Sequence, residues 1–177
     1  MSDPCPMTSI LRSPRFLPFL VLVFSMVWIS QHPASANAKT SWILPIQAPA
    51  LLVRNYLAPN SDYSSGHRGV DYSVTSGQQL VAPSDGVIAF KGSVAQKPVL
   101  AVQHNGGYKA AFEPACSLLP VGSKVVVGQP IGWVCPALSY KSHCSPWLCL
   151  HFSLRHNGSY LSPLAMIGGL APSVVSK

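Results

Sequence analysis

Short apolar runs, rich in Val, Ile and aromatic residues, alternate with Gly, Pro, Asn and Ser from residue 40 onward. Turn residues at such close intervals leave little room for helices, and we predict only one short helix, at 162–167. The chain is therefore expected to fold as a single antiparallel all-β domain, similar to a sandwich. The predicted strands are 42–46, 51–54, 69–74, 86–92, 98–103, 107–112, 123–127, 130–135 and 147–155.

Residues 16–30 form an almost unbroken apolar stretch, which follows Arg12 and Arg15 and precedes alternating alanines at 34–38. A positive region, a short apolar region and an Ala-x-Ala ending are typical of a secretory signal peptide. About 15 apolar residues span roughly 22 Å of helix, less than the ~30 Å hydrocarbon core of a membrane. A cleaved signal is therefore favoured, and a signal anchor is the alternative.

The predicted organisation is a signal peptide at 1–38, one β domain at 39–171 and a tail at 172–177. Cleavage after residue 38 leaves 139 residues, in which Lys and Arg fall from 12 to 10 and Asp and Glu from 5 to 4, so the net charge is +6. The basic residues are scattered, which argues against a nucleic-acid partner. A basic exported protein would be attracted to the anionic polymers of a bacterial envelope.

Four cysteines follow the predicted signal: Cys116, Cys135, Cys144 and Cys149. An even number of cysteines in an exported domain indicates disulfides, with three possible pairings. Isolated buried thiols are the alternative for Cys116 and Cys135. Cysteine usage thus agrees with a secreted or cell-envelope location.

The segment 66–73 (GHRGVDYS) places His67 and Asp71 four residues apart. Gly66 and Gly69 allow a tight turn into an extended segment, so both side chains could converge on one point. Zinc accepts imidazole nitrogen and carboxylate oxygen together. A His-x-x-x-Asp spacing alone is a weak signal for a metal site.

The predicted strand 147–155 carries a third candidate ligand, His151. Alternation places Leu148, Leu150, Phe152 and Leu154 on the core face, and Cys149, His151 and Ser153 on the opposite face. Joined to His67 and Asp71, His151 would complete a set of three ligands. Three protein ligands leave one tetrahedral position open for water, as in catalytic zinc sites. A half-exposed strand histidine is the simpler interpretation of His151 alone.

Five motifs in a fixed order make the chain resemble the lysostaphin or LytM-type zinc peptidases, which cut peptidoglycan peptides. The motifs are His-x-Gly-x-Asp within 66–71, Ala-Pro-x-x-Gly within 82–87, His-x-x-Gly-Tyr within 103–108, Val-x-x-Gly-x-x-Ile-Gly at 125–132 and Leu-His-Phe-x-x-Arg-x-x-Gly at 150–158. The resemblance implies the lysostaphin-type β domain, a duplicated hybrid motif. It also implies a zinc metalloendopeptidase, with His67, Asp71 and His151 as ligands and peptidoglycan peptide as substrate. The membrane would be contacted only through the N-terminal segment.

Two histidines that family members usually carry near the attacking water are absent from this sequence. Cys149 stands at one of these positions and Pro114 at the other. A catalytically degenerate wall-binding or regulatory domain of the same fold is therefore the alternative function. His143 is the predicted substitute acid or base, and Glu113 is a second candidate, although a solvated loop carboxylate explains it more simply.

The resemblance also suggests a recurring His-Cys…Cys-Leu-His pattern, here from His143 to His151. A Cys144–Cys149 disulfide would pin this loop beside the metal face, and its competitor is a free Cys149 thiolate as a fourth zinc ligand. His104 and His156 occupy turn-like positions and are expected at the surface.

The segment 121–134 is expected to form a β-hairpin around Gly128-Gln129-Pro130. It also looks like half of a lipoyl or biotinyl carrier domain. A carrier needs an exposed lysine at the hairpin tip, and this tip has none, so the carrier function is disfavoured.

Overall fold

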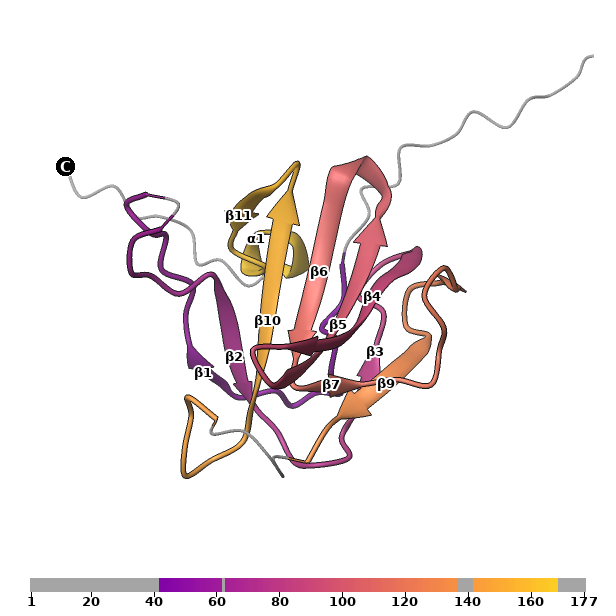
Figure 1. Cartoon of the computed structure of the whole chain (residues 1–177), viewed down its shortest axis with the longest axis horizontal. Helices are drawn as coiled ribbons and strands as arrows, with labels where there is room; N and C mark the ends of the chain where they lie inside the picture. Colours follow the sequence, from indigo (N-terminus) through magenta and orange to yellow (C-terminus); the bar gives the residue numbers. More distant parts are fainter. Residues whose placement is uncertain (1–41, 62, 137–141, 169–177) are drawn as a thin grey trace, which may run out of the picture. The chain divides into compact units, whose positions relative to one another are not determined.

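The computed structural model of the chain describes residues 42–61, 63–136 and 142–168. These residues form two antiparallel sheets and one short helix, so the predicted all-β class is confirmed (Figure 1). The predicted signal segment 1–38 and the tail 172–177 lie outside the described residues. Within the described ranges, no helix is both long enough and apolar enough to cross a membrane.

The larger sheet has the strand order β1-β2-β10-β6-β5-β4-β8, with β11 paired to β10. Its strands are β1 (Leu52–Arg54), β2 (Gly69–Ser73), β4 (Gly86–Val94), β5 (Lys97–His104), β6 (Tyr108–Glu113), β8 (Lys124–Val125), β10 (Cys149–His156) and β11 (Ser159–Leu161). A 3-10 turn (Asn105–Gly107) joins β5 to β6. The smaller sheet has the order β3-β9-β7 and comprises β3 (Gln79–Val81), β9 (Pro130–Val134) and β7 (Ala115–Cys116), and α1 (Leu164–Ile167) follows β11.

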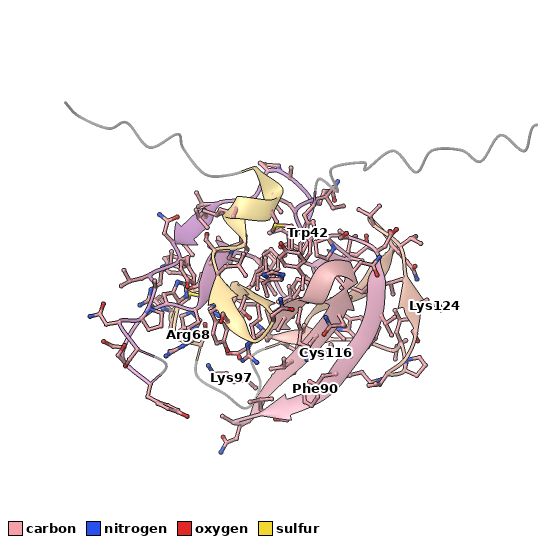
Figure 2. All side chains as sticks on the ribbon, turned by 90° about the horizontal axis from the view of Figure 1, so that it is seen from above. Trp42, Arg68, Phe90, Lys97, Cys116 and Lys124 are labelled. Carbon is pink, nitrogen blue, oxygen red and sulfur yellow. A yellow bond between two sulfur atoms is a disulfide. The ribbon has the colours of Figure 1, made fainter. Side chains whose placement is uncertain are left out.

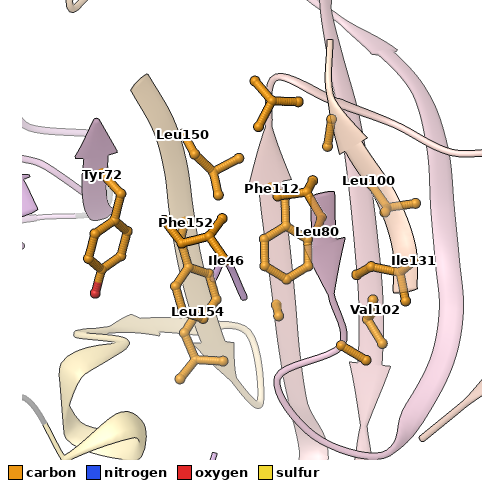
Figure 3. Close-up of a cluster of buried hydrophobic side chains, with 14 of the residues drawn as sticks. Ile46, Tyr72, Leu80, Leu100, Val102, Phe112, Ile131, Leu150, Phe152 and Leu154 are labelled. Atoms are coloured by element: carbon orange, nitrogen blue, oxygen red, sulfur yellow. The ribbon is translucent and has the colours of Figure 1, made fainter. Parts of the chain in front are cut away.

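One face of the larger sheet packs against the smaller sheet and forms the core. Strict alternation places Leu150, Phe152 and Leu154 of β10 in this core, each with no exposed surface. The rings of Phe112 and Phe152 stack across β6 and β10 with centroids 5.3 Å apart. Leu80 and Ile131 from the smaller sheet are buried in the same cluster (Figure 3).

The opposite face of the larger sheet is turned to solvent. Trp42 is buried on the core side, whereas Phe90 of β4 is 40% exposed on the outer side (Figure 2). The side chains that alternate with the buried ones, among them His151 and Ser153 of β10, therefore lie on this outer face. The outer face of β10 thus carries the side chains of His151 and Ser153.

The predicted strand at 42–46 is wrong. Two single backbone bonds hold this segment, from Ile43 N to Pro83 O and from Val81 N to Pro45 O, each 2.9 Å long. Pro45 has no N–H, so a ladder cannot continue through it. Trp42 and Ile46 are nevertheless buried, which explains why the segment looked like a strand.

The predicted hairpin at 121–134 is also wrong. β8 pairs with β4 in the larger sheet, whereas β9 pairs with β3 and β7 in the smaller one. Between them, Gly128 N donates to Ala82 O and Ala82 N donates to Gln129 O, both at 2.9 Å. Gly128 has a φ of +78°, which suits glycine. These bonds direct β9 away from β8 and into the second sheet.

His104 was expected at the surface, but it is only 4% exposed, at the end of β5. Its Nδ1 donates to the carbonyl of Asp85 at 2.9 Å, and its ring lies 4.4 Å from that of Trp42. Its Nε2 is buried and has no hydrogen-bond partner among the described residues. Burial lowers the pKa of His104, although the backbone acceptors at Asp85 and Ser84 oppose that shift.

We expect His104 to make the fold less stable in mild acid. Because its pKa is lower in the folded state than its ordinary value of about 6.5, the unfolded chain binds the proton first as pH falls. Stability should be lost below about pH 6.5, by up to about 1.4 kcal/mol per pH unit. Urea unfolding of the metal-free protein between pH 7.5 and 5 should show a weaker pH slope in His104→Asn. His156→Asn, at an exposed position, should keep the parent slope, and equal slopes in all three proteins would contradict this role for His104.

Candidate metal centre

Asp71 of β2 and His151 of β10 lie directly opposite each other in the antiparallel ladder. Residues paired in this way share a face of the sheet, here the outer face. The Nδ1 of His151 lies 2.8 Å from Oδ1 of Asp71. Asp71 has no exposed surface, so its carboxylate depends on protein partners rather than on bulk water.

His67 reaches the same carboxylate from the segment that precedes β2. Two backbone bonds with Leu57, of 2.8 and 2.9 Å, fix its main chain. Its Nδ1 donates to the carbonyl of Asn55 at 2.7 Å, and since a carbonyl only accepts, Nδ1 carries the proton. In a neutral ring this leaves the lone pair on Nε2, which lies 3.1 Å from Oδ2 of Asp71 and 3.2 Å from Nδ1 of His151.

His143 completes the group from the loop before β10. Its Nε2 lies 2.8 Å from Oδ2 of Asp71, and its side chain is 34% exposed. The expected Cys144–Cys149 disulfide is present and ties this loop to the first residue of β10. The sulfur of Cys149 is therefore not a free thiolate, and its role as a fourth zinc ligand is ruled out in this structure. A second disulfide joins Cys116 to Cys135.

We call His67, Asp71, His143 and His151 the donor cluster, because one ligand atom of each lies within 4.8 Å of all the others. Burial alone would raise the pKa of Asp71, but hydrogen bonds from His151 and His143 and their charge outweigh it, so the pKa is lowered. The lone pair of His67 Nε2 thus faces an ionised carboxylate, which is a repulsive contact unless a cation lies between them. Imidazole nitrogens with a carboxylate oxygen suit zinc. The cluster therefore fits the metal that the sequence predicts.

Glu113 takes no part in the donor cluster. It was expected in a loop, but it is the last residue of β6, opposite His151 in the ladder. Its carboxylate makes a 2.7 Å ion pair with Lys97. The carboxylate of Glu113 is therefore held by Lys97 and not by the cluster.

A cavity of about 280 Å³ lies on the outer face of the larger sheet, and Ser153, which lines it, is two residues along β10 from His151. Its floor is made of the small side chains Ser153, Ala111 and Ala101, which are neighbours in the ladders of β10, β6 and β5. Lys109 and Arg155 also line it. We call this cavity the sheet groove. The residues of its floor are small enough for an extended chain to lie on them.

Gly69 has a role in the site that the sequence did not indicate. A Cβ at this position would lie 2.5 Å from the carbonyl oxygen of Phe152 and 2.7 Å from Nε2 of His151. The imidazole of His151 therefore rests against the bare backbone of β2, and its Nδ1 is turned toward Asp71. The second role that the sequence missed is that of Asn55, because it acts through its main-chain carbonyl and no residue type marks it.

Comparison with known proteins identifies a family whose model the sequence matches. A family model described as peptidase family M23 matches residues 65–163. An uncharacterized protein of Mycobacterium tuberculosis is 28% identical over 158 residues, which cover 86% of this chain. They cover 61% of the relative, so this chain spans about three fifths of its length.

Solved structures show the same fold at low sequence identity. The SpoIIQ protein of the SpoIIQ–SpoIIIAH pore forming complex superimposes with a TM-score of 0.59 at 18% identity, over 72% of this chain and 90% of that one. A zinc containing peptidase from Vibrio cholerae gives 0.56 at 18%, over 68% and 38%. Lysostaphin gives 0.54 at 21%, over 72% and 58%, in agreement with the predicted lysostaphin-type fold.

We expect one zinc ion to bind per chain through His67, Asp71 and His151. Loss of a direct ligand should weaken zinc binding by more than the roughly 10–100-fold that loss of a supporting residue costs. Elemental analysis and competition with a chelating dye should show this loss in His67→Ala, His151→Ala and Asp71→Asn. His156→Ala is the control, since His156 lies outside the cluster. A metal-free native protein whose melting curve ignores added zinc would contradict the assignment.

Substitution of Gly69 by alanine should disturb the centre without removing a ligand. The new methyl group must displace the His151 ring or the β10 backbone, which should cost about 1–3 kcal/mol of stability and weaken zinc binding. Gly92→Ala is the matched strand control, because the nearest atom to its Cβ is the ring edge of Phe90 at 3.0 Å. Thermal melting and zinc titration of both variants measure the effect, and equal behaviour of the two would argue against close packing at Gly69.

Proposed function

Because this chain belongs to peptidase family M23, we propose that it is an exported zinc endopeptidase that cleaves peptide bonds in peptidoglycan. The observation that carries the proposal is the donor cluster, which places three imidazoles and a buried carboxylate beside an open groove. The disulfides Cys116–Cys135 and Cys144–Cys149 support an oxidising, extracytoplasmic location. The apolar segment 16–30 supplies the export signal in this proposal.

His67, Asp71 and His151 would hold the zinc ion. When bound, zinc acts as a Lewis acid that polarises the scissile carbonyl and makes water more acidic. The protein's contribution is to keep the three ligands in fixed positions. The Asn55 carbonyl fixes the ring of His67, the ladder between β2 and β10 fixes Asp71 against His151, and Gly69 admits the His151 ring.

His143 is the general base in this proposal. Its Nε2 donates to Oδ2 of Asp71, so in a neutral ring Nδ1 holds the lone pair that accepts a proton, and a third of the side chain remains open to solvent. The base takes a proton from the attacking water and returns it to the amine nitrogen that leaves when the C–N bond breaks. His143 lies in a loop, whereas the histidine that family members usually carry lies on the strand. The Cys144–Cys149 disulfide fixes the backbone next to His143 and so compensates for its position in a loop.

The sheet groove suits an extended peptide with free carboxylates. Its floor of Ala101, Ala111 and Ser153 lets a chain lie flat, and Lys109 and Arg155 supply positive charge. Peptidoglycan peptides carry carboxylates, and charge complementarity of this kind guides encounter and orientation. The excess of basic residues in the chain acts in the same direction.

A non-catalytic wall-binding or regulatory domain is the second candidate. Cys149 and Pro114 replace histidines of the family pattern, and the same fold occurs in the SpoIIQ protein of a pore forming complex. The purified protein should be incubated with peptidoglycan, with and without a chelator. Metal-dependent release of new amino groups supports the peptidase, whereas zinc and peptidoglycan binding without release supports the second candidate.

We expect His143→Ala to keep its zinc and lose turnover by roughly 10²- to 10⁴-fold, as removal of a general base does. Glu113→Gln should retain most activity, because the Glu113 carboxylate is held by Lys97. Amino-group release and zinc affinity should be measured on both variants. Full turnover in His143→Ala with strong loss in Glu113→Gln would reverse the assignment. A large fall in zinc affinity in His143→Ala would instead make His143 a fourth ligand.

A further inference from the structure

His151, Ser153 and Arg155 follow one another at every second residue on the outer face of β10. At roughly 3.3 Å per residue, four residues of strand place Arg155 roughly 13 Å from His151. Ser153 lies between them, and its partner on β6 is Ala111, so both side chains on this path are small. An extended chain that lies along β10 therefore reaches from the donor cluster to Arg155.

Arg155 lies directly opposite Lys109 in the ladder between β10 and β6, which run side by side in the larger sheet (Figure 1). Both side chains are exposed, and both line the sheet groove. We call Lys109 and Arg155 the basic pair. Like charges that face each other across a ladder destabilise a sheet. The basic pair therefore costs stability unless an anion binds between the two side chains.

The acidic side chains within the described ranges are all engaged elsewhere. There are three of them, Asp71, Asp85 and Glu113. Asp71 is held by the histidines of the donor cluster, and Glu113 pairs with Lys97 at 2.7 Å. The carboxylate of Asp85 accepts the backbone N–H of Val127 at 2.7 Å. None of the three forms an ion pair with the basic pair, which is left open to the carboxylate of a ligand.

Tyr160 of β11 holds the guanidinium of Arg155. Nη2 of Arg155 donates to the Tyr160 hydroxyl, and the guanidinium carbon lies 4.3 Å from the centre of the ring. A guanidinium has five N–H donors, so this bond leaves others for a ligand, and its planar fork matches a carboxylate. A side chain that is already held in place loses little freedom on binding, which favours affinity.

We propose that the basic pair is a binding site for a free carboxylate of the substrate, roughly 13 Å along β10 from the metal centre. The identity of the ligand rests on the proposed peptidase function, since peptidoglycan peptides carry such carboxylates. An extended chain spans about 3.3–3.6 Å per residue, so about four residues separate the bound carboxylate from the bond that is cut. The basic pair thus selects one peptide bond by its distance from a carboxylate.

Probes with a metal-binding group at one end and a carboxylate at the other test this spacing. Succinyl-(Gly)n hydroxamates carry both groups, and acetyl-(Gly)n hydroxamates lack the carboxylate. The hydroxamate occupies the zinc ion of the purified zinc-loaded protein, so the carboxylate must bind elsewhere. A second series, with the hydroxamate at the amino end and the carboxylate or its amide at the other, covers the opposite chain direction. Affinities are measured by calorimetry, without turnover.

We expect the carboxylate to increase affinity about tenfold, or about 1.4 kcal/mol, in one of the two chain directions. The gain should be largest at about three glycines, because the succinyl group is about one residue long. It should be small at one glycine and at six. Comparison of succinyl-Gly-Gly amide with acetyl-Gly-Gly amide, which carry no hydroxamate, measures the same preference without the metal.

Variants assign the preference to the basic pair. Arg155→Gln and Lys109→Gln should lose it, whereas Lys124→Gln, an exposed lysine of β8 outside the sheet groove, should keep it. Lys109→Glu should lose the preference and also melt at a higher temperature than the parent, because opposite charges then face each other in the ladder. A purely structural role for Lys109 would not produce this combination of results.

An equal affinity for probes with and without the carboxylate would overturn the site, as would a gain that does not depend on the number of glycines. A preference that survives in both Arg155→Gln and Lys109→Gln would also overturn it. A protein that shows the preference but releases no peptide ends retains the carboxylate site and fails as a peptidase. A protein that hydrolyses peptidoglycan without the preference is a peptidase that lacks this site.

Discussion

The site depends on the contacts between the buried carboxylate of Asp71 and three imidazoles. A charged group without exposed surface is costly unless polar partners surround it, and here three imidazoles do so. Those imidazoles come from three separate places: the segment before β2, strand β10 and the disulfide loop. The carboxylate therefore contacts side chains from three parts of the chain that are distant in sequence. A cation bound by the cluster would be coordinated by side chains in this arrangement.

The sequence predicted those parts of the fold that depend on local pattern. Alternation in β10 separates Leu150, Phe152 and Leu154 from His151, as expected. The pattern could not show which sheet a short run joins, because that depends on partners distant in sequence. β8 and β9 follow one another closely, yet they belong to different sheets. Strands of two or three residues, such as β3 and β7, are too short to show a period of two.

Residue type and motif order marked the predicted ligands His67, Asp71 and His151 and the predicted base His143, and the structure brings the four together. What the sequence could not reveal acts through the backbone. The Asn55 carbonyl selects the tautomer of His67, and the bulge at Val53 decides which side chain faces Asp71. His104 was misassigned for a related reason: its turn-like surroundings suggested exposure, whereas the packing of Trp42 over its ring buries it.

The Cys144–Cys149 disulfide makes assembly of the site depend on the redox conditions of the compartment that holds the protein. Ligands on β2 and β10 are placed by the sheet ladder, which forms in any aqueous compartment. The loop that carries His143 and Trp147 is placed by a covalent bond that forms only under oxidising conditions. Under reducing conditions this loop would be untied from β10, whereas the backbone ladder between β2 and β10 contains no disulfide. Under the proposed export, the same bond delays assembly of the complete site until the chain reaches an oxidising compartment.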